Sequence, residues 1–347
     1  MTFSNTLIHW YKNNARVLPW RNTKDAYSIW ISEIILQQTR VEQGLPYYQR
    51  FIQAFPNVLS LHQASEDQVL KMWEGLGYYS RARNMKYAAQ QIVEEYLGVF
   101  PSNYKHIIAL KGIGPYTAAA IASFAFDLPY AVVDGNVFRV LSRYFGIDTP
   151  INSTPGKKEF DVLAQKYLIK SRAATYNQAI MEFGALFCKP KNPDCQQCPL
   201  VSSCAAFANN KVALLPIKLK KLKIKDRYLN FILLSNGNEV LIEKRQEENI
   251  WKGLYQLPLI ETDKQIPVQE ILVREDFMGL MGNKSYEIRS VQEMEHKLTH
   301  RLLKIRFLHI EIGELLSSNY LKIKFEELKE YAFPKPVENY LNRCSNS

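Results

Sequence analysis

The pattern of apolar and polar residues divides the chain into two parts. From residue 1 to about residue 208, apolar residues recur at helical spacing. Turn signals interrupt them, such as FPN at 55–57, FPSN at 100–103 and TPINSTPG at 149–156. The alternation typical of strands is not found in this part of the sequence. The pattern therefore predicts an almost wholly helical domain over residues 1–208.

The last third of the chain has the pattern of an α+β fold. Residues 227–245, RYLNFILLSNGNEVLIEKR, form two apolar runs around a turn with Gly237, which predicts a β-hairpin. Residues 296–312, HKLTHRLLKIRFLHIEI, predict one further long strand. A helix is expected at FEELKEYAF and another before the end of the chain. We expect an α+β domain over residues 228–347.

The segment between these two parts is rich in lysine. Residues 211–227, KVALLPIKLKKLKIKDR, contain Pro216 and only one acidic residue, so we expect an exposed basic linker over residues 209–227. Lys and Arg outnumber Asp and Glu by 21 to 15 in residues 1–210 and by 7 to 1 in residues 211–227, but fall behind by 16 to 18 afterwards. A polyanion is therefore expected to bind mainly the first part and the linker.

Composition narrows the class of protein further. A chain of 347 residues with 47% hydrophobic content is ordinary for a globular protein of two or three domains. No apolar run reaches the roughly 18 residues of a membrane span. The first twenty residues have no basic region followed by an apolar core and a cleavage site. We expect a cytoplasmic protein that does not bind membranes and that acts as a monomer.

Four of the five cysteines lie in one short stretch with the spacing C-x6-C-x2-C-x5-C: Cys188, Cys195, Cys198 and Cys204. In a cytosolic chain this grouping indicates a metal site rather than disulfides. Zinc sites usually have two short C-x2-4-C pairs, and only one is present, so a [4Fe-4S] cluster fits better. Zinc and unliganded thiols are the alternatives. Lys189 and Lys191 lie in the first loop, where they could contact DNA phosphates.

A single acid stands in a strongly apolar stretch near the start of the chain. Residues 29–40 are IWISEIILQQTR, and Glu33 shares a helical stripe with Ile29 and Leu36. A carboxyl group in apolar surroundings keeps its proton more readily, which suits a general acid near neutral pH. The alternative is that Glu33 lies on a thin polar edge and contacts solvent.

Two further motifs suit an enzyme that acts on DNA. Residues 110–126 begin LKGIGPYTA, where Gly112 and Gly114 permit a tight turn whose amides can hold a phosphate; a plain packing corner between helices is the alternative. In VVDGNVFRV, Asp134 precedes a helix and could be only its N-cap. Cleavage of a glycosidic bond, however, needs one acid and one carboxylate that stabilises the sugar cation, and Glu33 with Asp134 supplies such a pair.

These motifs, in this order and spacing, resemble the helix-hairpin-helix DNA glycosylases of the endonuclease III superfamily, and within it the adenine DNA glycosylases of the MutY type. The resemblance is strong over residues 1–208 and implies an all-α glycosylase domain with a [4Fe-4S] cluster loop. In that fold a six-helix part covers about residues 23–125, and an iron-sulfur part covers residues 1–22 and 126–208. The implied partner is double-stranded DNA with adenine opposite 8-oxoguanine or guanine.

The resemblance also implies roles for individual positions. Glu33 is expected to protonate adenine and then to activate water, with Asp134 stabilising the sugar and Tyr116 and Asn136 shaping the site. Tyr116 stands where bifunctional members have a lysine, so base release without strand cleavage is expected. The adenine pocket is matched by Trp20, Arg21 and Gln178. Contacts to the opposite base are matched by Gln38, Thr39, Leu76 and Tyr78, although Leu76 and Tyr78 could be ordinary core residues.

The C-terminal domain resembles a Nudix domain. Its HKLTHRLL segment occupies the place of the loop that recognises 8-oxoguanine, with Leu298, Thr299 and His300 in place of the usual Phe-Ser-His. Thr299 keeps a hydroxyl group, but Leu298 cannot stack as an aromatic ring does. Residues 253–290 lack the acidic series of active Nudix enzymes, so this domain is expected to bind rather than to catalyse.

Two other functions are consistent with part of the sequence. A thymine or uracil mismatch glycosylase would use the cluster, the hairpin and both carboxylates, but this function does not explain the presence of the C-terminal domain. A DNA-binding iron-sulfur protein without enzymatic activity would not need a buried Glu33.

Overall fold

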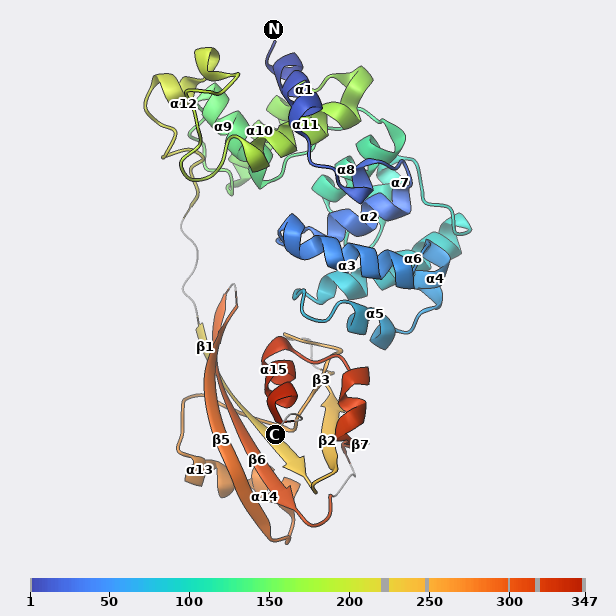
Figure 1. The fold of residues 1–347 in the computed structure, drawn as a ribbon, viewed down its shortest axis with the longest axis vertical. Helices are drawn as coiled ribbons and strands as arrows, with labels where there is room; N and C mark the ends of the chain where they lie inside the picture. Colours follow the sequence, from blue (N-terminus) through green and yellow to red (C-terminus); the bar gives the residue numbers. More distant parts are fainter. Residues whose placement is uncertain (1, 220–224, 247–249, 299, 316–318, 345–347) are drawn as a thin grey trace. The chain divides into compact units, whose positions relative to one another are not determined.

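The chain forms two compact units in the computed structural model, which describes residues 2–219, 225–246, 250–298, 300–315 and 319–344 (Figure 1). One unit consists of residues 1–63 and 84–220, and the other of residues 64–83 and 221–347. The second unit therefore includes a segment from the middle of the predicted helical domain as well as the predicted α+β domain.

The first unit is helical, as the spacing of apolar residues predicts. Its elements are α1 (Phe3–Asn14), η1 (Pro19–Arg21), α2 (Ala26–Ile35), α3 (Val41–Ala54), α4 (Val58–Gln63), α7 (Tyr104–Ala109), α8 (Pro115–Phe126), α9 (Gly135–Phe145), α10 (Thr154–Tyr167), η2 (Lys170–Arg172), α11 (Ala173–Leu186), η3 (Val201–Ser203) and α12 (Ala205–Ala208). Helix α6 (Ser80–Tyr96) begins in the second unit and continues into the first.

Helix α8 forms the centre of the first unit. It packs against α2, α7 and α11, and its residues from Thr117 to Phe124 are all buried. Pro115 stands at its first position, where the missing N–H costs no hydrogen bond. Helix α2 is also mostly buried, and Asp25 caps it by accepting a hydrogen bond from the Ser28 N–H at 2.8 Å. The two helices that carry Glu33 and Tyr116 are therefore held in one core.

Part of the predicted linker is not exposed. Leu215 is only 3% exposed, and its carbonyl accepts a hydrogen bond of 3.0 Å from the buried guanidinium of Arg143. The Ile217 carbonyl accepts a hydrogen bond of 3.0 Å from the Ile151 N–H. Residues 211–219 thus belong to the helical unit, where the buried Leu215 and the hydrogen bonds of the Leu215 and Ile217 carbonyls hold the segment, although Leu214, Ile217 and Leu219 are exposed.

The second unit contains a mixed sheet and short helices. Its strands are β1 (Lys225–Ser235), β2 (Glu239–Lys244), β3 (Tyr255–Gln256), β4 (Leu259–Thr262), β5 (Tyr286–Lys297), β6 (Arg301–Ile312) and β7 (Leu321–Lys324). Its helices, besides the first residues of α6, are α5 (Glu66–Met72), α13 (Val268–Leu272), α14 (Glu275–Met281), η4 (Phe325–Glu330) and α15 (Lys335–Cys344). The predicted α+β character is confirmed.

The sheet runs in the order β3-β2-β1-β6-β5, with β1 parallel to β6 and the other pairs antiparallel. Helix α15 covers one face through Val337 and Tyr340, whereas α13 and α14 cover the other through Ile271 and Phe277. The predicted hairpin at residues 227–245 is confirmed as β1 and β2.

The long strand predicted over residues 296–312 is confirmed from Arg301 to Ile312 as β6, but its predicted start at residue 296 is wrong. Strand β5 ends at Lys297 and β6 begins at Arg301, so the chain turns between them. The backbone N–H of Leu298 donates a hydrogen bond to the Arg301 carbonyl, which closes this turn. The apolar residues on both sides continue the same pattern across the turn, so periodicity predicts one strand, whereas the resemblance to the 8-oxoguanine loop predicts a loop at this point.

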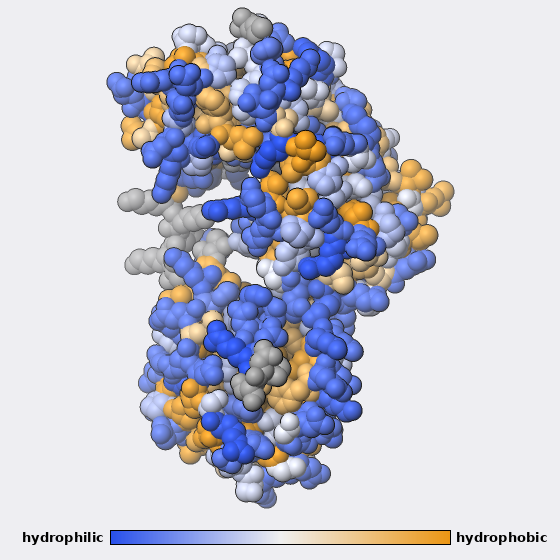
Figure 2. All heavy atoms as spheres, viewed as in Figure 1, coloured by the Kyte–Doolittle hydropathy of each residue, from blue (hydrophilic) through white to orange (hydrophobic). Residues whose placement is uncertain are grey.

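Hydrophilic residues cover most of the face shown in Figure 2, with apolar residues between them. Within the described ranges, no helix has both the length and the apolar character needed to span a membrane.

Candidate active site

Glu33 lies on the buried side of α2 and is 7% exposed, so the alternative of a solvent-exposed polar edge is wrong. Its Oε2 accepts a hydrogen bond of 2.8 Å from the Tyr116 hydroxyl. Burial raises the pKa of Glu33 to about 7, the Tyr116 hydrogen bond and Arg21 oppose this shift, and the nearby Asp134 adds to it. A carboxyl group with this pKa exchanges its proton near neutral pH, as general acid catalysis requires.

Asp134 is both the N-cap of α9 and part of the same cavity. Its Oδ1 accepts hydrogen bonds from the N–H groups of Asn136 and Val137 at 2.8 and 2.7 Å, and its Oδ2 accepts one from Asn136 Nδ2 at 2.8 Å. Burial raises the pKa of Asp134, while these three hydrogen bonds and the Arg139 charge act in the opposite direction. The capping role and a catalytic role are therefore compatible.

The two carboxyl groups line one cavity of about 500 Å³ in the first unit. The cavity is also lined by six further residues that the sequence predicted, namely Trp20, Arg21, Thr39, Tyr116, Asn136 and Gln178. Trp20 is buried, and its ring meets the Tyr48 ring edge-on, with 5.0 Å between the ring centroids. Gln178 Oε1 accepts a hydrogen bond of 2.7 Å from the Tyr11 hydroxyl. The volume is in the range of small-molecule binding sites.

Glu182, a buried acid on α11, binds two arginines that line this cavity, Arg16 and Arg21. Glu182 is 1% exposed and accepts hydrogen bonds from Arg21 at 2.6 and 2.9 Å and from Arg16 at 2.7 and 2.9 Å. Burial alone would raise the pKa of Glu182, but the two arginines hold it at about 2. Sequence reasoning missed Glu182 and Arg16. The feature that singled out Glu33, one acid within an apolar helix, is also present in MEFGALF at residues 181–187.

Arg139 joins the cavity to the cysteine loop. Its guanidinium donates hydrogen bonds to Asn136 Oδ1 at 2.8 Å, to the Gly184 carbonyl at 2.6 Å and to the Cys188 carbonyl at 2.7 Å. An added Cβ on Gly184 would lie 2.7 Å from the Cβ of Asn136, so only glycine lets α11 approach α9 so closely. The orientation of Asn136 therefore depends on both helices.

The four cysteines Cys188, Cys195, Cys198 and Cys204 line one small pocket beside Arg143. The Arg143 Nη1 lies 3.5 Å from the Cys188 Sγ. Burial, together with the neighbouring thiols, raises the pKa of Cys198 to about 11. Several thiolates in one pocket would need a positively charged centre to neutralise their negative charge, and iron or another metal ion could supply it. Within the described ranges, no three His, Cys, Asp or Glu side chains are grouped so as to hold a metal ion, so the cluster stays a prediction.

The residues predicted to bind DNA phosphate lie at the surface. Gly112 has φ +79° and Gly114 is the N-cap of α8, so the tight turn is present at the start of that helix. An added Cβ on Gly112 would lie 2.6 Å from the Cβ of Asn84, which leaves no room for a side chain. Lys189 and Lys191 are exposed in the cysteine loop.

The residues predicted to contact the opposite base lie in both units. Gln38 is exposed in the first unit, whereas Leu76 and Tyr78 belong to the second unit, where Leu76 is buried and Tyr78 is 47% exposed. In the predicted 8-oxoguanine loop, Leu298 packs against the core of the second unit and His300 is exposed. Thr299 lies outside the described residues.

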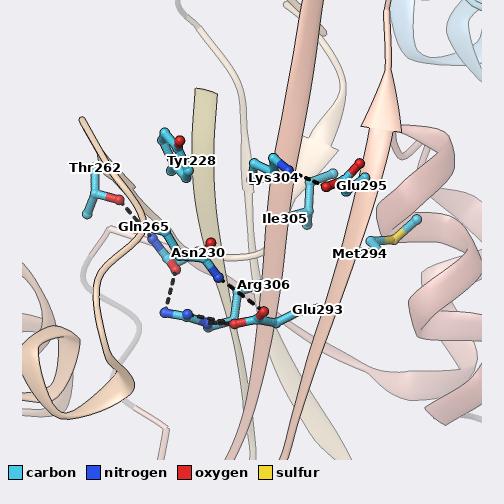
Figure 3. A pocket seen from close by; sticks show the side chains of 10 residues that line it. All are labelled: Tyr228, Asn230, Thr262, Gln265, Glu293, Met294, Glu295, Lys304, Ile305 and Arg306. Atoms are coloured by element: carbon cyan, nitrogen blue, oxygen red, sulfur yellow. Dashed lines mark hydrogen bonds and ion pairs between the residues drawn. The ribbon is translucent and has the colours of Figure 1, made fainter. Parts of the chain in front are cut away.

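The second unit has a hollow of about 220 Å³ on its sheet (Figure 3). There Arg306 pairs with Glu293 at 2.6 Å and donates hydrogen bonds to the Ile266 carbonyl and to Asn230 Oδ1. Because these groups already satisfy one another, the network braces the segment before α13 against the sheet. The predicted site residues that the structure describes lie elsewhere.

Two families match the chain. Residues 31–168 match the HhH-GPD superfamily base excision DNA repair protein family, and residues 230–343 match the NUDIX domain family. The chain is 35% identical to an adenine DNA glycosylase of Buchnera aphidicola subsp. Schizaphis graminum, over 98% of this chain and 97% of that protein. It is 41% identical to the human adenine DNA glycosylase over 59% of this chain and 39% of the human protein.

Solved structures of DNA glycosylases resemble the chain as well. A thermostable thymine-DNA glycosylase has a TM-score of 0.56 and 30% identity, over 60% of this chain and 95% of that chain. A non-covalent endonuclease III–DNA complex has a TM-score of 0.52 and 20% identity, over 60% of this chain and 99% of that chain, and therefore supports the fold alone.

Proposed function

The chain belongs to the adenine DNA glycosylase family and is a DNA glycosylase of base excision repair, and from this premise we propose that it releases adenine lying opposite 8-oxoguanine or guanine in duplex DNA. The observation that supports the proposal most is the buried Glu33, which shares a cavity with Asp134 and accepts a hydrogen bond from Tyr116. The reaction is hydrolysis of the N-glycosidic bond without cleavage of the strand.

Glu33 is the general acid of the proposed reaction. With a pKa of about 7, about half of the molecules carry the proton at neutral pH. Glu33 gives this proton to N7 of the flipped adenine, and the glycosidic bond breaks with its electron pair leaving on the base. The ionised Glu33 then takes a proton from water as that water adds to the sugar carbon.

Asp134 stabilises the positive charge that develops on the sugar. Its three hydrogen bonds from Asn136 and Val137 favour the ionised form, and they fix the carboxylate at the start of α9. Tyr116 has no amine and cannot form an imine with the sugar, so the strand is not cleaved.

Trp20, Arg21 and Gln178 form the adenine pocket in this proposal. The Arg21 guanidinium is held by Glu182 and is therefore oriented before substrate binds, which lowers the entropic cost of binding. The duplex is held by the amides around Gly112 and Gly114 and by Lys189 and Lys191.

The opposite base is contacted by Gln38, Thr39, Leu76 and Tyr78 in this proposal, and 8-oxoguanine by Leu298, Thr299 and His300. The four cysteines would hold a [4Fe-4S] cluster, which supplies a rigid cross-link for the loop that carries Lys189 and Lys191. That all four cysteines line one pocket supports this proposal.

Single-turnover assays on four duplexes test the proposal. The duplexes carry A opposite 8-oxoguanine, A opposite G, T opposite G, or U opposite G, and alkali reveals the abasic site after incubation. Adenine release from the first two is expected, and Glu33→Gln should slow it by at least about 100-fold while duplex affinity stays within a few-fold. Release of thymine or uracil instead of adenine would support the mismatch glycosylase alternative.

A further inference from the structure

The second unit contains a segment that comes from the helical part of the sequence. Residues 64–83, which we call the docking segment, form one compact unit with residues 221–347. The docking segment carries Leu76 and Tyr78, and the same unit carries the turn between β5 and β6. Glu33 and Asp134 lie in the other unit. The division therefore separates the residues of the chemical step from most residues predicted to contact the opposite base.

Asp67 on α5 makes one set of contacts between the docking segment and the sheet. It pairs with Lys244 at 2.5 Å, and it accepts a hydrogen bond of 3.2 Å from the Tyr255 hydroxyl. The Lys244 Nζ also lies 5.7 Å from the centroid of the Tyr255 ring. Three side chains from α5, β2 and β3 thus contact one another, and each constrains the other two.

Glu74 makes the second set of contacts, immediately before the loop that carries Leu76 and Tyr78. Its side chain is 14% exposed, accepts a hydrogen bond of 2.9 Å from the Phe333 N–H, and pairs with Lys71 at 2.6 Å. Lys71 in turn donates a hydrogen bond of 2.9 Å to the Tyr331 carbonyl. Hydrogen bonds to charged, mostly buried groups are stronger than neutral ones, so the backbone at residues 331–333 is fixed to the end of α5.

The backbone of the second unit also approaches α5 closely. An added Cβ on Gly253 would lie 3.0 Å from Glu66 Oε1 and 3.2 Å from Leu70 Cδ1. Helix α5 therefore has polar contacts at both ends and close packing between them. A single surface ion pair contributes little to stability, but this combination of contacts is more extensive.

We propose that the docking segment lets the C-terminal sheet set the position of residues 75–79, so that this loop, Leu298 and His300 contact the opposite base as one body. The inference rests on the proposed function. Asp67 and Glu74 are positioning residues in this account, because they act on DNA recognition through Leu76 and Tyr78. Breaking the docking contacts should therefore lower the preference for 8-oxoguanine and leave the chemical step at Glu33 intact.

A charge exchange in the full-length protein tests the proposal. Asp67→Lys and Lys244→Asp are made singly and together, Asp67→Asn serves as a milder variant, and Asp276→Lys serves as a control. Asp276 on α14 pairs at 2.9 Å with Arg274, the N-cap residue of that helix, so the control reverses a similar charge away from the docking segment. Single-turnover rates are measured with A opposite 8-oxoguanine and A opposite G, and hydrogen exchange is measured over residues 64–83.

Each single reversal should lower the ratio of the two rates by about three- to tenfold and speed hydrogen exchange in the docking segment. The double exchange should restore both, and the control should change neither. Single variants that keep the wild-type ratio, or a double variant that restores neither quantity, would overturn the inference. If the wild-type protein itself releases no adenine, the proposed function fails, and this result is separate from the behaviour of the variants.

Discussion

Glu33→Gln should make the helical unit more stable at alkaline pH although it slows the proposed adenine release by at least about 100-fold. The pKa of Glu33 is about 7 in the fold and 4.5 as its ordinary value, so the folded state binds the proton more tightly than the unfolded chain. The wild-type protein consequently loses stability as pH rises from about 4.5 to about 7, and the glutamine variant, which does not ionise, avoids this loss.

The size of the effect follows from the shift. One pKa unit corresponds to 1.36 kcal/mol, so the rise in the pKa of Glu33 from 4.5 to about 7 lowers the free energy of unfolding of the wild-type protein by about 3 kcal/mol at pH 8. Below pH 4 the carboxyl group is protonated in both states, and this loss is absent. For a unit of this size, 3 kcal/mol corresponds to a rise in Tm of roughly 6–12 °C. Because Glu33 is only 7% exposed, screening by solvent reduces the figure little.

Thermal unfolding of both proteins at several pH values is the appropriate assay. Glu159→Gln is the control, because Glu159 is exposed on α10 and its replacement removes a carboxylate without burial. The Tm difference between Glu33→Gln and wild type should grow between pH 5 and pH 7.5 and then level off. A difference that does not depend on pH would refute the reasoning, since it would show that Glu33 has no raised pKa.

Four further outcomes are expected. Tyr116→Lys should introduce some strand cleavage through an imine, and borohydride should trap a covalent product that Tyr116→Phe does not form. Elemental analysis of the purified protein should find four irons per chain, whereas one zinc and no iron would contradict the assigned cluster. Thr299→Ala with His300→Ala should reduce discrimination between 8-oxoguanine and guanine by about 1–3 kcal/mol per lost contact, and equal loss of affinity for both duplexes would indicate phosphate binding instead. Asn177→Ala should lower the free energy of unfolding by about 1–3 kcal/mol in denaturant titrations, because Asn177 is fully buried and bonds the backbone at Tyr130 and Val132; no change would mean that these groups find other partners.

The sequence predicted the parts of the site that depend on local pattern. Glu33 stood out because one acid interrupts an apolar helix, and its burial follows from that pattern. Asp134 was recognised as an N-cap from its neighbours, and a second acid gave it a chemical role. The pairing of Arg16 with Glu182 was missed because 166 positions separate the two residues, and helical periodicity contains no information about such distant pairs, although Glu182 has the same local pattern as Glu33.

Other differences have equally definite causes. Periodicity alone extends a strand across the turn between β5 and β6, because apolar residues continue on both sides and the turn has no Gly or Asn; the loop was predicted there only through the family resemblance. The linker over residues 209–227 was expected to be exposed because six lysines lie between residues 211 and 225. The position of residues 211–219 is instead fixed by the buried Leu215 and by the carbonyls of Leu215 and Ile217, which accept hydrogen bonds from Arg143 and Ile151.

The position of residues 211–219 determines where the catalytic part can be severed from the rest of the chain. Protease cleavage near residue 208 would remove the Leu215 carbonyl and expose the site on α9 where it binds, leaving the guanidinium of Arg143 with one acceptor fewer. Cleavage beyond residue 219 keeps that acceptor in place. A protease that cuts at exposed lysines should therefore leave a stable fragment that ends at or beyond Lys218, about ten residues beyond the last helix of the helical part.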